Sequence, residues 1–241
     1  MPTDITCEAA PLNTRQPPQT GKLPFSPLTL WGRLKWLAVA AGCFHLAYEF
    51  ALCAPLIIGF LYALFRLAHV PQRRDAMILG WIAGLFIYGP QLAFFWTIFD
   101  RAAIALWLVL GTWLSLYLML QRFALLRLDA PWAGLAAPLL WTGLEYFRSE
   151  LYYLRFSWLN IGYVFAPFPN TTLLRYAGMY GVGFLLMLLA ASVPRWRLRR
   201  ATFISCGVAL AALAAVAARS GDARHSPEIK VAGVQLEFRR G

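Results

Sequence analysis

The chain is poor in charged residues, which make up 14% of its 241 positions, while hydrophobic residues make up 60%. Soluble domains carry about 25% charged residues, so this chain has too few to cover a surface that faces water. It has four cysteines, Cys7, Cys43, Cys53 and Cys206, with no CxxC spacing and no histidine pairing near them. These shortages exclude a soluble globular enzyme and a secreted disulfide scaffold.

Residues typical of catalytic and metal-binding sites are also scarce. Of the three histidines, His45 and His69 belong near opposite membrane faces and His225 falls in a polar linker. No serine or cysteine stands in a nucleophile motif, and no cluster has the spacing of metal ligands. The sequence therefore predicts no catalytic residue, no metal site and no cofactor in these 241 positions.

Long apolar runs are abundant, and a bilayer core needs about 20 apolar residues per helix, with a range of about 17–25. We expect an all-α membrane protein with a bundle of about seven transmembrane helices in residues 28–218. Residues 1–27 are rich in proline and are expected to form a disordered cytoplasmic tail. The predicted spans are 30–47, 52–68, 77–99, 102–120, 131–147, 173–193 and 201–218.

The basic residues give a net charge of +11 but lie at the ends of the apolar runs rather than in one patch. Nucleic-acid binding is therefore not expected. With the N-terminus in the cytoplasm, most lysines and arginines that lie between spans fall on the cytoplasmic side, as the positive-inside rule requires. The tail after residue 218 is then expected on the opposite face.

Two features of the first three spans predict helix packing. A tight turn is expected between the first two spans, with Glu49 near the membrane interface. Gly80 and Gly84 form a GxxxG pattern that would let a neighbouring helix approach closely. Pro90 is expected to kink the third span, because proline removes a backbone donor.

The most informative stretch lies around the loop between the fifth and sixth spans. Glu145 and Arg148 are three residues apart, so on a helix they share a face and can pair. Ionisable groups near a membrane are functional candidates, although an ion pair that anchors the helix end is an equally good interpretation. The aromatic segment 156–163 contains Trp158 and Tyr163 and is expected at the outer interface. It could be a simple aromatic belt, or it could line a portal for a lipid-attached substrate.

The composition of the chain changes from apolar to polar at Ser220. A polar linker is followed by residues 229–238, whose β-branched content suits a strand. A single strand needs partners. Residues 219–241 are therefore interpreted as a linker and the start of a truncated domain, completed either by a missing remainder of the domain or by a partner.

Several of these segments resemble one family. Residues 137–148, APLLWTGLEYFR, resemble the A-P-x-x-W-x-x-x-E-x-x-R signature of bacterial apolipoprotein N-acyltransferases. Residues 156–163 resemble the F-P-W-x-x-x-G-Y loop of that family, with Ser157 in place of the usual proline. Residues 178–185 resemble its G-x-Y-G-x-x-F-L motif. Residues 80–96 resemble its third span, and residues 230–235 resemble the first strand of its nitrilase-like domain. Ser149 stands where glycine is common.

The resemblance implies an acyltransferase of lipoprotein biosynthesis in the bacterial inner membrane, with a periplasmic C-terminus. Such enzymes move an acyl chain from a phospholipid to the α-amino group of a lipoprotein's N-terminal diacylglyceryl cysteine. Their catalytic Cys, Glu and Lys lie in the nitrilase-like α/β domain, so the chain alone is expected to be inactive. The implied partners are membrane phospholipid and a lipoprotein substrate, and the candidate substrate-binding residues are Glu145, Arg148, Trp158 and Tyr163.

Two alternatives stay open. The chain could be a non-catalytic membrane subunit that works with a separately encoded nitrilase-like chain. A small transporter is less favoured, because Glu49, Asp100 and Glu145 fall at the ends of spans rather than within them.

Overall fold

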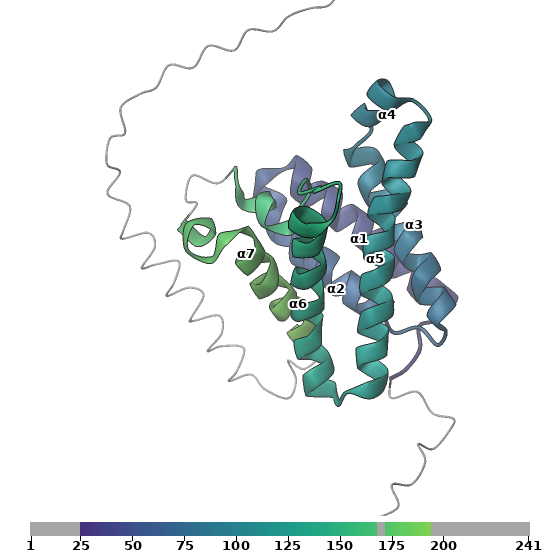
Figure 1. The fold of residues 1–241 in the computed structure, drawn as a ribbon. Helices are drawn as coiled ribbons and strands as arrows, with labels where there is room; N and C mark the ends of the chain where they lie inside the picture. The colour runs from purple at the N-terminus through teal and green to yellow at the C-terminus, as the bar shows by residue number, and fades with distance from the viewer. Residues whose placement is uncertain (1–24, 168–171, 194–241) are drawn as a thin grey trace, which may run out of the picture. The chain divides into compact units, whose positions relative to one another are not determined.

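The computed structural model describes residues 25–167 and 172–193, and every regular element in these ranges is helical (Figure 1). The prediction of an all-α chain is confirmed for these residues. The predicted seventh span, the predicted strand at 229–238 and most of the predicted N-terminal tail lie outside them. The α-helices are α1 (Leu30–Glu49), α2 (Ile57–Leu67), α3 (Arg73–Gln91), α4 (Phe94–Phe99), α5 (Ala102–Arg127), α6 (Ala130–Tyr146) and α7 (Thr172–Ser192). Three shorter helical segments are the 3-10 helices η1 (Ala51–Leu56) and η3 (Ile161–Phe165) and the π-helical turn η2 (Phe147–Leu151).

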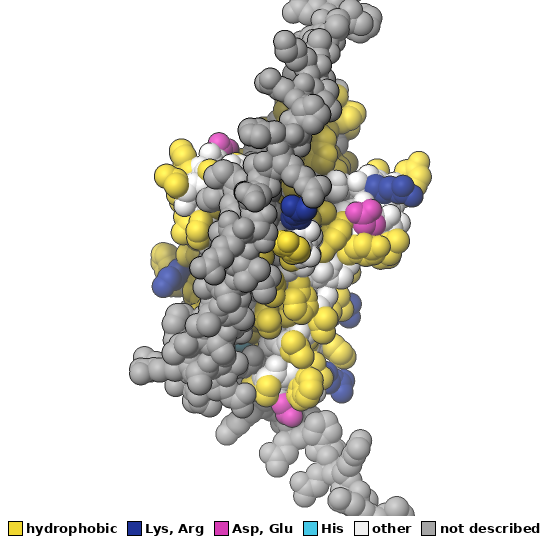
Figure 2. All heavy atoms as spheres, turned by 90° about the vertical axis from the view of Figure 1, so that its left-hand side faces the viewer, with side chains coloured by type: hydrophobic (Ala, Val, Ile, Leu, Met, Phe, Trp, Pro, Cys, Tyr) yellow, Lys and Arg dark blue, Asp and Glu magenta, His cyan; other side chains and the backbone are white. Residues whose placement is uncertain are grey.

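Two of the described helices are long and apolar enough to cross a membrane, judged by length and composition: α5 and the Leu173–Ser192 part of α7. The seven-span bundle is not confirmed. Charged residues stand in α1 and at the start of α3, and α2 and α6 have 11 and 17 residues. Hydrophobic side chains nevertheless cover most of the described surface in the view of Figure 2, with charged side chains isolated among them.

Several predicted boundaries are wrong. The span predicted at 52–68 begins as the 3-10 helix η1, which contains Pro55, and only then continues as α2. The span predicted at 77–99 starts earlier, at Arg73, and a break at Leu92 and Ala93 separates α3 from α4. The distortion predicted at Pro90 is thus present as a break just after it. Helix α5 runs seven residues past the predicted end at 120, to Arg127.

The chain divides into two compact units. Among the described residues, the first contains 25–41 and 63–136, and the second contains 42–62, 137–167 and 172–193.

In the first unit, α3 lies along α5, and α4 contacts α5 beside its start (Figure 1). The two helices come very close: a Cβ added at Gly80 would lie 2.3 Å from Ser115 Cα, and one added at Gly84 would lie 2.3 Å from Gly111 Cα. The Ser115 hydroxyl donates to the Met77 carbonyl across this contact, at 2.8 Å. The prediction that the GxxxG pattern permits close helix packing is confirmed.

The core of the second unit contains a row of aromatic rings. The centroid of the Phe44 ring lies 4.6 Å from that of Tyr48 and 5.0 Å from that of Phe60. The centroids of the Phe60 and Trp141 rings are 6.0 Å apart. Such tilted and edge-to-face pairs stabilise a core beyond the area that they bury. This row of rings connects α1, α2 and α6 next to the loop that contributes to the candidate site.

Helix α7 packs against η3 in the same unit. A Cβ at Gly162 would lie 2.5 Å from the Met179 carbonyl oxygen, so glycine is needed for this approach. Next to Met179, α7 is interrupted at Gly178, where φ is 67°. Glycine adopts this left-handed backbone without steric cost.

Candidate functional site

The candidate site is built around the C-terminal end of α6. Glu145 lies in the last turn of this helix, and the π-helical turn η2 that follows carries Arg148 and Ser149 inward, so that both are buried. The chain then returns over the helix end and brings Asn160, which is fully buried, to the same place. Four polar side chains, Glu145, Arg148, Ser149 and Asn160, thus form a buried polar cluster.

Asn160 connects the members of this cluster. Its side-chain oxygen accepts a hydrogen bond from the Arg148 guanidinium, and its amide nitrogen donates to the Ser149 hydroxyl at 3.0 Å. Its backbone carbonyl accepts from the Tyr48 hydroxyl at 3.0 Å. Buried polar groups need such partners, because an unsatisfied one costs about 1–3 kcal/mol.

Glu145 forms a second contact with the loop, at the residue that follows Asn160. Its Oε1 accepts a hydrogen bond from the Ile161 amide at 2.8 Å. A Cβ added at Gly183 of α7 would lie 3.1 Å from Oε2. The small residue at 183 therefore leaves room for the carboxylate.

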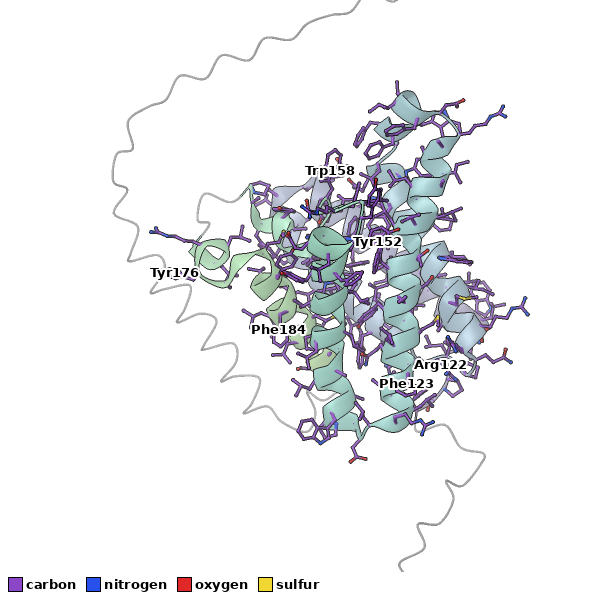
Figure 3. All side chains as sticks on the ribbon, viewed as in Figure 1. Arg122, Phe123, Tyr152, Trp158, Tyr176 and Phe184 are labelled. Atoms are coloured by element: carbon purple, nitrogen blue, oxygen red, sulfur yellow. The ribbon has the colours of Figure 1, made fainter. Side chains whose placement is uncertain are left out.

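The loop that runs from η2 to η3 covers this cluster and exposes aromatic rings. Trp158 and Tyr163 are 52% and 45% exposed, and Tyr153 is 93% exposed. Figure 3 shows Trp158 and Tyr152 at the loop end of α6. The backbone beside Trp158 is unusual, because Leu159 has a φ of 58° and is not glycine. Such a conformation persists only where the surroundings hold it, and the adjacent Asn160 provides that hold.

The structure therefore divides the four predicted residues into two pairs. Glu145 and Arg148 come together in the buried cluster, which agrees with the expectation that they share a helix face. Trp158 and Tyr163 lie on the exposed side of the loop. The Arg148 guanidinium also donates to the backbone carbonyl of Trp158 at 3.4 Å, so the cluster is bonded to the backbone that carries the exposed ring.

Sequence reasoning missed Asn160, Ser149 and Tyr48 as members of the site. A signal for Asn160 existed, because it is the single amide inside an otherwise aromatic and apolar segment. Ser149 was noted only as a departure from the family pattern, yet its hydroxyl completes the hydrogen bonds of Asn160. Tyr48 gave no signal, because its role depends on packing between distant segments.

The described residues contain no group of three or more His, Cys, Asp and Glu side chains that could hold a metal ion. The cluster is suited to holding the loop and its exposed rings in one conformation. Its charged groups are covered, whereas the exposed groups of the loop are mainly aromatic and aliphatic.

Comparison with known proteins identifies the family. The family model described as the apolipoprotein N-acyltransferase N-terminal domain matches residues 29–192. The chain belongs to the apolipoprotein N-acyltransferase family. The matched range includes the polar cluster and the exposed loop of this acyltransferase domain. A search among curated proteins found no match.

Proposed function

We propose that residues 29–192 form the membrane domain of an apolipoprotein N-acyltransferase and hold its lipid-bearing substrates next to the catalytic chemistry. In the reaction that the family implies, an ester bond of a phospholipid breaks and an amide bond forms at the α-amino group of a diacylglyceryl cysteine. Both substrates are anchored in lipid, so the domain must present a surface at the height of the headgroups.

The observation that carries this proposal is the exposed aromatic loop held by the buried polar cluster. Tryptophan and tyrosine favour the boundary between hydrocarbon and water, and a rigid loop loses little conformational freedom when a ligand binds. We assign Trp158 and Tyr163 as contacts for a lipid-attached substrate and Glu145 and Arg148 as residues that position them.

We also propose that the domain is a multi-pass protein of the bacterial inner membrane, with its N-terminus in the cytoplasm. Helices α5 and α7 meet the length and composition of spans. The remaining helices cross as shorter or interrupted segments, which is tolerated where neighbouring helices satisfy the backbone.

Binding of a fluorescent diacylglyceryl-cysteine peptide to the detergent-purified chain tests the proposal. We expect Trp158→Ala to weaken binding about tenfold, as loss of a central aromatic contact does, and Tyr163→Ala to weaken it less. Fluorescence anisotropy measures the change.

Trp132→Ala is the matched control, because this tryptophan is also exposed, at 62%, but lies at the start of α6. Binding should stay unchanged in this variant. Equal losses in the Trp158 and Trp132 variants, or no loss in either, would show that the loop is not the substrate contact.

A further inference from the structure

The end of the first unit opposite α4 carries a concentration of positive charge. It is formed by the first turns of α1 and α3 and the last turns of α2 and α5. Hydrogen bonds hold these ends together: the Leu28 amide donates to the His69 carbonyl at 3.0 Å, and Arg122 donates to the carbonyls of Val70 and Pro71. Figure 3 shows Arg122 and Phe123 in this part of α5. The basic residues of this end are Arg33, Lys35, Arg66, Arg73, Arg74, Arg122 and Arg127.

Internal contacts account for only some of these charges. Arg33 pairs with Asp75 at 3.1 Å, and Arg122 is occupied by backbone carbonyls. Lys35, Arg73 and Arg74 are exposed, as is Arg127. The acidic residues at this end are Asp75 and the exposed Asp129, so the balance is strongly positive.

The positions of two of these cations are unfavourable within the protein. Arg73 and Arg74 occupy the first turn of α3, where the helix dipole is positive and favours anions. The residue before them, Gln72, provides no side-chain cap. Neither a side-chain cap nor the helix dipole therefore stabilises these two arginines, and an external anion beside them would be favoured.

Exposed aromatic side chains surround the same charges. Trp31 is 81% exposed, Phe123 is 59% exposed, and Trp132 lies nearby, because the Gln121 amide donates to the Ala133 carbonyl at 2.9 Å. Arg127 lies over the Phe123 ring, 5.6 Å from its centroid. A surface that mixes cations with exposed aromatic rings fits the headgroup level of a bilayer rather than bulk water.

We propose that this basic end binds the phosphate headgroups of anionic phospholipids in the leaflet that it faces. Exposed arginines supply the charge, and Trp31, Phe123 and Trp132 enter the boundary between headgroups and acyl chains. The proposal does not depend on the acyl-transfer role. It requires only that the chain sits in a membrane.

The test compares which lipids the purified chain retains. The chain is reconstituted into vesicles of phosphatidylglycerol and phosphatidylcholine with the same acyl chains, extracted gently, and its bound lipids are counted by mass spectrometry. We expect enrichment of phosphatidylglycerol, and about a fivefold loss of that preference for each charge removed, because one basic residue near an anionic surface contributes about that factor. High salt should reduce the preference.

Two triple variants are matched in chemistry and number. Arg73, Arg74 and Arg127 are changed to glutamine in one, and the exposed Arg101, Arg155 and Arg175 are changed to glutamine in the other. The preference should collapse in the first and stay near wild type in the second. Changing the first three to lysine should keep it, and circular dichroism confirms that each variant is folded.

Each other outcome overturns the inference. If both triple variants lose the preference equally, the effect is net charge and not this end. If inorganic phosphate alone competes as well as phosphatidylglycerol, or a short RNA binds in its place, the occupant is not a lipid. Failure of the chain to enter vesicles would also overturn the inference, because it requires that the chain sits in a membrane.

Discussion

At the scale of single residues, Asn160 is the member of the polar cluster whose loss should matter most. Asn160→Ala removes the side-chain acceptor of the Arg148 guanidinium and the partner of Ser149 while both remain buried. We expect a loss of about 3 kcal/mol in the free energy of unfolding, because a buried charge loses its partner. Chemical denaturation in detergent measures it, and trypsin should cleave faster after Arg155.

Asn160→Asp tests the hydrogen bond to Arg148 separately from the hydrogen bond to Ser149. Aspartate keeps an oxygen acceptor for Arg148 and loses the amide donor to the Ser149 hydroxyl and the Met179 sulfur, so the loss should be smaller. If alanine and aspartate destabilise the chain equally, the bond to Arg148 is not what holds the loop.

His69 should make the first unit sensitive to acid. Burial lowers the pKa of His69 below its usual value; its hydrogen bond to the Phe65 carbonyl opposes this in part, and the charge of Arg66 adds to the lowering. The unfolded chain, with a pKa near 6.5, then binds the proton more readily than the folded chain. Stability is therefore full above about pH 6.5 and falls as the pH decreases toward the folded pKa.

We expect the thermal midpoint to fall between about pH 7.5 and 5.5. His69→Asn should flatten that fall, since asparagine does not titrate and can place an N–H near the Phe65 carbonyl. A variant that keeps the full slope would assign the acid sensitivity to another group.

At the scale of elements, the contact between α3 and α5 allows no added methyl group. Gly80→Ala and Gly84→Ala would each place a Cβ 2.3 Å from a backbone Cα of α5, so the helices must separate. We expect a loss of about 2 kcal/mol for each change, as overpacking usually costs. Denaturation in detergent measures the difference from wild type.

Gly89 on the same helix is the control. A Cβ there would lie 3.9 Å from a ring carbon of Trp107, which is an ordinary contact. Gly89→Ala should be neutral or stabilise the helix by up to about 1 kcal/mol. A loss like that of Gly80→Ala would mean that alanine destabilises α3 wherever it replaces glycine, and that the close contact with α5 is not the cause.

The same elements show what the sequence could and could not predict. Spacing alone predicted the GxxxG contact and the shared face of Glu145 and Arg148, because both follow from helix periodicity. The 3-10 start of the second span and the break at Leu92 were missed. An apolar segment has the same composition whether it forms a continuous α-helix or contains a 3-10 turn or a break, so composition does not reveal these changes. Asn160 was missed because its partners come from distant segments, and only the folded loop, with its left-handed Leu159, brings them together.

At the scale of the whole molecule, α5 fixes the expected topology. Its 26 residues span about 39 Å, enough to cross the hydrocarbon core. Arg101 precedes it, and Arg122 and Arg127 lie in its final turns with the other basic residues of that end. Because positive charge is retained in the cytoplasm, we expect Arg127 on the cytoplasmic side and Arg101 on the periplasmic side.

Cysteine labelling decides this orientation. In a chain whose four native cysteines are replaced by serine, Arg101→Cys should react with an impermeant maleimide in intact spheroplasts, whereas Gln72→Cys should react only after lysis. Gln72 precedes α3 and belongs to the basic end, so it reports the opposite face from Arg101. Labelling in the reverse order would place the basic end outside, and then the proposed cytoplasmic position of the N-terminus could not hold.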